Sequence, residues 1–428
     1  MLRSMNTMFR SFFGTVAFKF FGQGFSLLLG VLLARALGPD NFGKYSYIMS
    51  IVAVATIPTV AGLPQLIIRE VSKNLSIGSL GEIRGVLIWA NLYVAIVSLI
   101  VIFLFFGLIN FDFFDDSIKS LLVIALFLIP LKGMLAKQSS VINAFQRPTL
   151  AQIPTCVVYP LIFFIMASAY CMFGSQLTID VVIFSQLISL FIATLFSVFV
   201  SQLIFRENVI SSAIPALYSF MTWHKALLPF SLMFIISSLN AELATFFLGF
   251  LSTDENVAYF KVASQGIILI SLNLQAINSI ISPQIASSFS NNEFSVTQEV
   301  LVKSVRLSVI CGVPISIGLY FFGGYIISFV FGDRYIDAAS VLKVLCIGQV
   351  VNLCCGSVGV VLNMTGNELS TVKALIVSII LSIALLFLLV PIYGALGAAW
   401  SVTISLSVWN LIMAFEVKRL TGLRTWIS

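Results

Sequence analysis

Residues 85–108 read GVLIWANLYVAIVSLIVIFLFFGL, and no charged side chain interrupts this stretch. An α-helix needs about 20 predominantly apolar residues to cross the ~30 Å of hydrocarbon in a bilayer. The stretch is long enough for one crossing, so it predicts a transmembrane helix. It also argues against a transmembrane β-barrel, because barrel strands are about ten residues long and alternate between polar and apolar side chains.

Comparable stretches recur along the whole chain. Of its 428 residues, 59% are hydrophobic and only 9% are charged, whereas soluble domains carry about 25% charged residues. We therefore predict an all-α integral membrane protein with little extramembrane structure. Twelve transmembrane helices are expected, near residues 12–36, 46–66, 85–108, 118–138, 151–173, 178–204, 226–250, 259–282, 305–330, 339–362, 370–390 and 395–415.

A polar loop, Arg206–Lys225, falls at the midpoint of the chain. We expect a six-helix N-terminal lobe at residues 1–210 and a six-helix C-terminal lobe at residues 211–428. A short internal repeat supports this division, since Leu37–Ser50 aligns with Leu251–Ser264 at a shift of half the chain. Because six helices return the chain to its starting side, the lobes would be parallel repeats. A pseudo-two-fold axis along the membrane normal relates such repeats in many secondary transporters.

Lysine and arginine are distributed unequally between the two sides of the predicted membrane. Most of the 23 residues of these types lie on the side of the N-terminus. Because cytoplasmic loops carry the excess of basic residues, both termini are expected in the cytoplasm. The basic residues on the opposite side are Arg35, Lys44, Lys119, Lys261, Arg334 and Lys343.

Lys19 is the most informative basic residue, because it falls inside the first predicted span. Lys19, Gln23 and Ser26 recur at helical spacing, so they share one face. A charged residue in a span costs about 2.5–3.5 kcal/mol on insertion scales and usually has a functional reason. Lys19 therefore predicts the cationic wall of a cavity. The alternative is that its ammonium group reaches back to the membrane interface.

Glu242 is the only acidic residue well within a predicted span. A carboxylate in a low-dielectric environment suits the binding of a coupling proton or sodium ion. The alternative is a structural role, in which Glu242 pairs with a lysine or forms a hydrogen bond between helices.

Several kinds of chemistry find no support in the sequence. The single histidine, His224, and the six cysteines have no metal-ligand spacing, and the GxxxxGK[ST], HExxH and GxSxG motifs are missing. No cofactor is therefore expected, and an enzyme is disfavoured. The net charge of +6 follows from the basic excess in the inner loops, so it does not indicate binding to nucleic acid.

The segment ARALGPDNFG (Ala34–Gly43) closes the first predicted span and leads into YSYIMSIVAVATIPTVAGLPQLIIRE (Tyr45–Glu70). This region resembles the polysaccharide transporter branch of the multidrug/oligosaccharidyl-lipid/polysaccharide exporter superfamily, whose O-antigen flippases have an (S/A)R-x-LGP-x-x-FG turn here. The segment also has a structural explanation. Gly38 and Pro39 would end the helix, Asp40 and Asn41 favour a turn, and Gly43 would allow a positive φ.

The resemblance implies an inner-membrane flippase that works by alternating access, with ion antiport as a source of energy. Its cargo would be an oligosaccharide repeat unit on undecaprenyl diphosphate. Membrane lipids and the polysaccharide polymerase machinery would be its other partners. An anionic diphosphate calls for cationic contacts. The candidates for substrate binding are Lys19, Gln23, Arg35, Lys132, Lys261 and Lys343, and the candidate for ion coupling is Glu242.

Three rival functions remain at this stage. A small-molecule cation exporter on the same scaffold would need buried carboxylates in its N-terminal lobe, and the first six predicted spans contain none except Asp180 at the very start of the sixth. A membrane-embedded polysaccharide polymerase or ligase usually has a large periplasmic loop, whereas the outer loops here are short. A peptidoglycan-precursor flippase typically has fourteen spans, against the twelve expected here.

Overall fold

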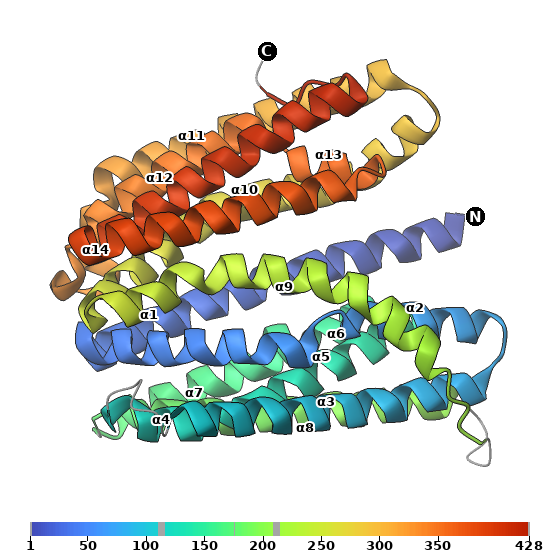
Figure 1. Cartoon of the computed structure of the whole chain (residues 1–428), viewed down its shortest axis with the longest axis horizontal. Coiled ribbons are helices and arrows are strands. Elements are labelled where there is room, and N and C mark those ends of the chain that lie inside the picture. Colours follow the sequence, from blue (N-terminus) through green and yellow to red (C-terminus); the bar gives the residue numbers. More distant parts are fainter. Residues whose placement is uncertain (1, 110–115, 175, 209–214, 427–428) are drawn as a thin grey trace. The chain divides into compact units, whose positions relative to one another are not determined.

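A computed structural model describes residues 2–109, 116–174, 176–208 and 215–426 of the chain (Figure 1). All regular elements in these ranges are helices. Apolar stretches adopt this form in a membrane because a helix satisfies its own backbone hydrogen bonds. In chain order the elements are α1 (Leu2–Val60), α2 (Leu63–Ser76), α3 (Leu80–Ile109), α4 (Asp116–Leu126), α5 (Leu128–Ala144), α6 (Pro148–Ile153), the π-helix η1 (Pro154–Val158), α7 (Tyr159–Met172), α8 (Ile179–Asn208), α9 (Phe220–Leu251), α10 (Asp254–Ser290), α11 (Phe294–Phe331), the 3₁₀ helix η2 (Asp333–Tyr335), α12 (Ala338–Cys355), α13 (Val358–Met364) and α14 (Glu368–Thr421).

Ten segments of the described chain are long and apolar enough to cross a membrane. Two of them greatly exceed one crossing. α1 has 59 residues and α14 has 54, which correspond to about 90 Å and 80 Å of helix at 1.5 Å per residue. Each contains one glycine with non-helical dihedral angles, Gly38 (φ 75°, ψ 171°) in α1 and Gly394 (φ 54°, ψ −128°) in α14. The two long helices are therefore kinked.

The chain forms two compact units. The first unit contains Met1–Leu37 and Ile48–Ser238, and the second contains Gly38–Tyr47 and Leu239–Ser428. A short piece of α1 thus belongs to the second unit, although α1 otherwise belongs to the first. The expected boundary at residues 210 and 211 lies outside the described residues.

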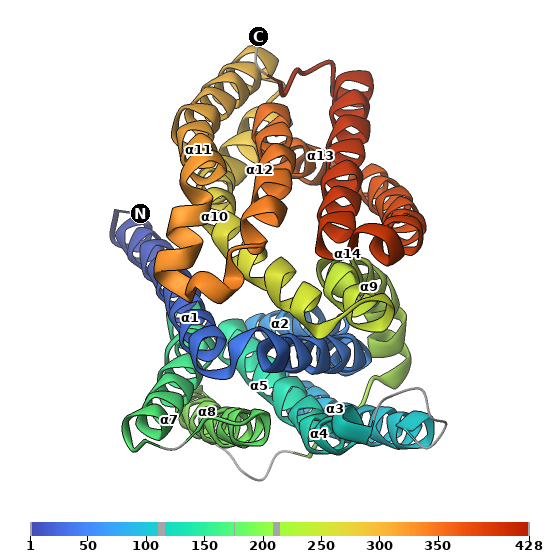
Figure 2. The ribbon, with the colours of Figure 1, turned by 90° about the vertical axis from the view of Figure 1, so that its left-hand side faces the viewer.

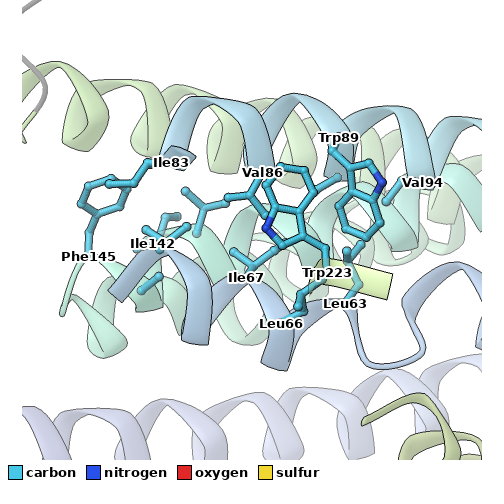
Figure 3. Packing of buried hydrophobic residues seen from close by; sticks show 14 of the residues in the cluster. Leu63, Leu66, Ile67, Ile83, Val86, Trp89, Val94, Ile142, Phe145 and Trp223 are labelled. Carbon is cyan, nitrogen blue, oxygen red and sulfur yellow. The ribbon is translucent and has the colours of Figure 1, made fainter. Parts of the chain in front are cut away.

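The first unit has a hydrophobic core between α2, α3, α5 and the start of α9 (Figure 3). Two tryptophans lie at its centre, with the ring centroids of Trp89 and Trp223 5.5 Å apart. Leu66 and Ile67 of α2 are fully buried beside them. In the second unit, α10, α11, α12 and α14 lie side by side (Figure 2). Ile285, Leu301 and Val361 are fully buried in their core.

The helix breaks at Gly38, as expected, but residues 39–43 are helical and do not form the expected turn. The backbone remains helical on both sides of a kink, and Gly38 alone has a positive φ in this segment. Pro39 fits directly after the kink because the first turn of a helical segment does not need its N–H group. Gly43 is helical and serves another purpose, since a Cβ there would lie 1.8 Å from the carbonyl oxygen of Asp254. The expectation of a positive φ at Gly43 was wrong.

The segment around Gly43 packs closely within the second unit. Phe42 is 2% exposed, and its ring lies edge-on to Tyr335 at 6.3 Å. The Lys44 ammonium group lies 3.4 Å from the Asp40 carboxylate and 3.9 Å from that of Asp254. Burial raises the pKa of the Tyr335 phenol above its ordinary value. These contacts give the segment a structural role.

Candidate functional site

Lys19, Gln23 and Ser26 are all exposed on α1, and we call them the α1 stripe. The neighbouring face of the helix packs against η1 and α7. A Cβ at Gly22 would lie 2.9 Å from the Cys156 Cβ, and the Phe25 and Phe164 rings meet edge-on at 6.0 Å. The packing contacts therefore lie beside the polar stripe, whose side chains remain exposed. This arrangement leaves the Lys19 ammonium group accessible to an anion.

Lys132 lies deeper in the membrane segment than the sequence indicated. The fourth predicted span ended at residue 138, which placed Lys132 near the inner end. The spanning segment in fact runs over Asp116–Ala144. Lys132 is then about 18 Å from its C-terminal end at 1.5 Å per residue. Its side chain is half-buried, and it lies near the middle of this candidate spanning segment.

Lys137 is on the same helix, about 10 Å from the C-terminal end of α5. Its side chain is only 4% exposed. It faces a cavity of about 270 Å³ between α3, α5 and α8. We call this the inner cavity. Its lining residues are Arg84, Leu87, Ile88, Asn91, Lys137, Gln138, Val141, Val198, Ser201, Gln202, Phe205 and Arg206.

The inner cavity is cationic. Arg84 and Arg206 lie at its exposed mouth, and Lys137 lies at its buried end. The Ser201 hydroxyl donates a hydrogen bond to Gln138 Oε1 at 3.0 Å, which ties α8 to α5. No carboxylate occurs among its lining residues in the described chain. The cavity therefore offers hydrogen-bond donors and positive charge, which are the features that bind an oxyanion.

Lys137 is not among the candidate residues predicted from the sequence. It lies at the inner end of the predicted span 118–138, where the positive-inside rule accounts for a lysine. The available signal was the polar run Lys137–Ser140 before the helix-ending Phe145–Arg147 segment. A span extended to that segment would have placed Lys137 inside the membrane.

The described carboxylates of the first unit lie at helix ends, except for Glu70. Glu82, Asp116 and Asp180 each occupy the first turn of a helix. Glu70 is buried in α2, where its carboxylate lies 2.6 Å from the guanidinium group of Arg69. In the described chain, the membrane interior of this unit is thus basic rather than acidic.

The remaining predicted site residues are divided between the two units. Arg35 is exposed on α1 in the first unit. In the second unit, Glu242 on α9 and Lys261 on α10 are half-buried. Lys343 is exposed on α12, and its ammonium group lies 5.9 Å from the centre of the Tyr320 ring. Within the part of the chain that the structure describes, Glu242, Lys261 and Lys343 form no ion pair with one another.

Two curated proteins resemble the chain along most of its length. One is named a probable low-salt glycan biosynthesis flippase of Haloferax volcanii. It is 21% identical over 420 residues, which cover 94% of this chain and 82% of the relative. The other is named as an O-antigen transporter of Shigella flexneri. It is 24% identical over 411 residues, covering 90% of this chain and 93% of the relative.

Solved structures share the fold. A multidrug resistance MATE family transporter of the MOP superfamily, in an inward-facing conformation, matches with a TM-score of 0.74 at 12% identity, over 93% of this chain and 94% of its own. The lipid II flippase MurJ matches with a TM-score of 0.68 at 16% identity, over 94% of this chain and 87% of its own. The fold alone therefore does not separate drug export from lipid flipping.

The sequence match to a family is more specific. Residues 8–289, which include all of the first unit's helices from α2 to α8, match the family described as polysaccharide biosynthesis protein. The match also covers the α1 stripe, Lys132 and the inner cavity. The chain therefore belongs to the polysaccharide biosynthesis protein family.

Proposed function

We propose that this protein is a flippase for a lipid-linked oligosaccharide. The cargo is an oligosaccharide repeat unit of O-antigen or a similar surface polysaccharide, carried on undecaprenyl diphosphate. The protein moves it from the cytoplasmic to the periplasmic leaflet of the bacterial inner membrane. It is a transporter rather than an enzyme, in keeping with the names of its relatives.

The observation that carries this proposal is the charge inside the first unit. Lys19 and Lys132 lie within membrane segments, while the described carboxylates of this unit lie at helix ends or, in Glu70, beside an arginine. An anionic diphosphate needs cationic groups to replace its water. A cationic drug needs buried carboxylates instead. The charge pattern therefore favours lipid flipping over multidrug export.

The proposed architecture has twelve crossings in two lobes of six. Ten segments qualify as spans by length and composition, and the kinks at Gly38 and Gly394 divide α1 and α14 into two crossings each. The repeated segments at residues 37–50 and 251–264 also meet, since Gly43 lies against the Asp254 backbone. Equivalent segments are expected to meet beside a two-fold axis. This supports the pseudo-two-fold relation between the lobes.

In the proposed mechanism, the lobes open alternately to the two sides while the lipid tail remains in the bilayer. The α1 stripe makes the first contact with the diphosphate through Lys19 and Gln23. Arg35, Lys132, Lys261 and Lys343 supply further positive charge along the path. Glu242 binds the coupling ion, and the polysaccharide polymerase machinery receives the flipped unit. Both termini remain in the cytoplasm.

Deletion of the gene tests the function. Lipid-linked repeat units are expected to accumulate, and a membrane-impermeant lectin added to intact spheroplasts should fail to bind them. Restoring the gene should return the glycan to the periplasmic face. Normal lectin binding in the deletion strain would contradict the proposal. Greater sensitivity to cationic drugs with unchanged polysaccharide would favour multidrug export instead.

A further inference from the structure

The inner cavity contains a lysine whose charge no group in the described part of the chain balances. Lys137 is 4% exposed, and within the described chain it has no ion-pair or hydrogen-bond partner. Burying an isolated charge is costly unless it is paired. The positive-inside rule explains Arg84 and Arg206, which are exposed near helix ends. The positive-inside rule does not explain Lys137, which lies farther from the end of its helix than either arginine does.

The geometry points to a binding site for the phosphate headgroup of a membrane lipid, within the leaflet on the side of the N-terminus. The three cations form a path into the membrane. Arg206 lies about 3 Å and Arg84 about 6 Å along the helix from the nearby ends of α8 and α3, and Lys137 lies about 10 Å from the end of α5. The headgroup would enter past the arginines and bind Lys137.

The size and polarity of the inner cavity suit such a headgroup. Its volume of about 270 Å³ would hold roughly nine water molecules at about 30 Å³ each. Asn91, Ser201 and Gln202 add polar groups beside the cations. Basic pockets between transmembrane helices on the cytoplasmic side are recognised sites for anionic lipid headgroups. A phosphate diester or monoester would fit with room for bridging waters.

The surfaces beyond the inner cavity favour a lipid over a free phosphate ion. α5 contacts both α3 and α8, which flank it (Figure 2). On α3, the face next to the lining residues carries exposed apolar side chains farther from the mouth, namely Leu92, Ile96, Leu99 and Phe103. On α8 the lining face continues into another exposed apolar set, namely Leu195, Phe191, Ile188 and Phe184. Acyl chains attached to a phosphate in the cavity would lie along these surfaces.

This site is separate from the proposed cargo contacts, because its lining includes no residue of α1 and does not include Lys132. Because none of the proposed cargo-binding residues lines the site, lipid binding there does not depend on the flippase proposal. A bound lipid would hold α3, α5 and α8 together at one end. A resident lipid would also balance the Lys137 charge in a way that no described carboxylate does.

The test uses the purified full-length chain in detergent with three probes. Dioleoyl phosphatidic acid carries both phosphate and tails, dioleoylglycerol carries the tails alone, and inorganic phosphate carries the anion alone. Thermal unfolding and native mass spectrometry report binding. Phosphatidic acid is expected to raise the unfolding midpoint and to remain bound, whereas the other two probes should do neither. Equal stabilisation by dioleoylglycerol or by inorganic phosphate would overturn the assignment to a lipid phosphate.

Lys137→Met is the decisive variant, because methionine keeps the length of the side chain and removes its charge. The affinity for phosphatidic acid should fall at least roughly tenfold, as expected for the loss of one charge-assisted hydrogen bond. Without lipid, the variant should unfold at the same temperature as the wild type or higher, since an unpaired buried charge has been removed. Lys225→Met, at an exposed lysine outside the cavity lining, is the control and should bind like the wild type.

Arg206→Gln provides an independent variant at an exposed position that is safe for folding. It should weaken phosphatidic acid binding by several-fold, because the arginine lies at the mouth of the inner cavity. Wild-type affinity in both Lys137→Met and Arg206→Gln would overturn the proposal.

Discussion

At the residue scale, Lys19 is the cation on which the proposed transport depends most. It is exposed on α1, beside the face that makes the packing contacts of Gly22 and Phe25. An ammonium group in this position can replace water around a diphosphate without first breaking an ion pair. Gln23, one turn farther along, adds an uncharged donor for the same ligand.

Lys19→Ala should reduce the rate of flipping roughly tenfold, which corresponds to the loss of one charge-assisted hydrogen bond. Lys19→Arg should keep most of the rate, because the positive charge remains. Surface polysaccharide at equal protein level measures the effect in cells. Lys73→Ala, at an exposed lysine of α2, is the matched control and should behave like the wild type. Full activity of Lys19→Ala would show that Lys19 only reaches back to the membrane interface.

The lysines of α5 illustrate what sequence could and could not provide at this scale. The residue types and the helix that carries them were predictable. Their depth was not, because the apolar run becomes polar after residue 136 although the helix continues to Ala144. Tertiary packing keeps the polar segment helical, since Gln138 accepts a hydrogen bond from Ser201 of a helix distant in sequence. Hydropathy alone does not contain this information.

At the element scale, α1 joins the two units. Its segment Gly38–Tyr47 belongs to the second unit, and the rest belongs to the first. The kink at Gly38 redirects the helix, and the missing side chain of Gly43 lets it approach the start of α10. The motif and its glycines were visible in the sequence. The need for a glycine at position 43 was not visible, because it comes from the close approach of Asp254, more than two hundred residues away in the sequence.

Gly43→Ala should therefore destabilise the protein, since its Cβ would lie 1.8 Å from the Asp254 carbonyl oxygen. Overpacking of this kind costs about 1–3 kcal/mol or more, so the midpoint of thermal unfolding in detergent should fall. Gly318→Ala is the control within the second unit, because a Cβ there meets no atom within 4 Å. It should be neutral or stabilising, as alanine is the better helix former. An unchanged midpoint for Gly43→Ala would contradict the close approach.

At the scale of the whole molecule, the proposed topology rests on the distribution of basic residues and on the number of crossings. Twelve crossings would place both termini on one side, and the basic excess predicts that this side is the cytoplasm. Sequence predicted twelve separate spans, whereas the structure joins two pairs of them into the kinked helices α1 and α14. At each kink a single non-helical glycine separates two helical stretches, and a hydropathy profile does not distinguish such a kinked helix from two separate helices.

Reporter fusions test this topology. A green fluorescent protein joined after residue 428 should be fluorescent, and alkaline phosphatase at the same position should be inactive, because the C-terminus is expected in the cytoplasm. Alkaline phosphatase inserted after Asp40, at the outer end of the first crossing, should be active. An active phosphatase at the C-terminus would indicate an odd number of crossings or the opposite orientation.

The central claim is that the protein moves an anionic lipid-linked oligosaccharide between leaflets, and reconstitution tests it most directly. Purified protein is incorporated into liposomes that contain a fluorescent oligosaccharide on undecaprenyl diphosphate, with the ion gradient imposed when required. A membrane-impermeant reductant then bleaches the headgroups that are accessible from outside. Bleaching should proceed beyond the outer leaflet in liposomes with wild-type protein, and more slowly with Lys19→Ala. Bleaching that stops at the outer leaflet, as in protein-free liposomes, would contradict the claim.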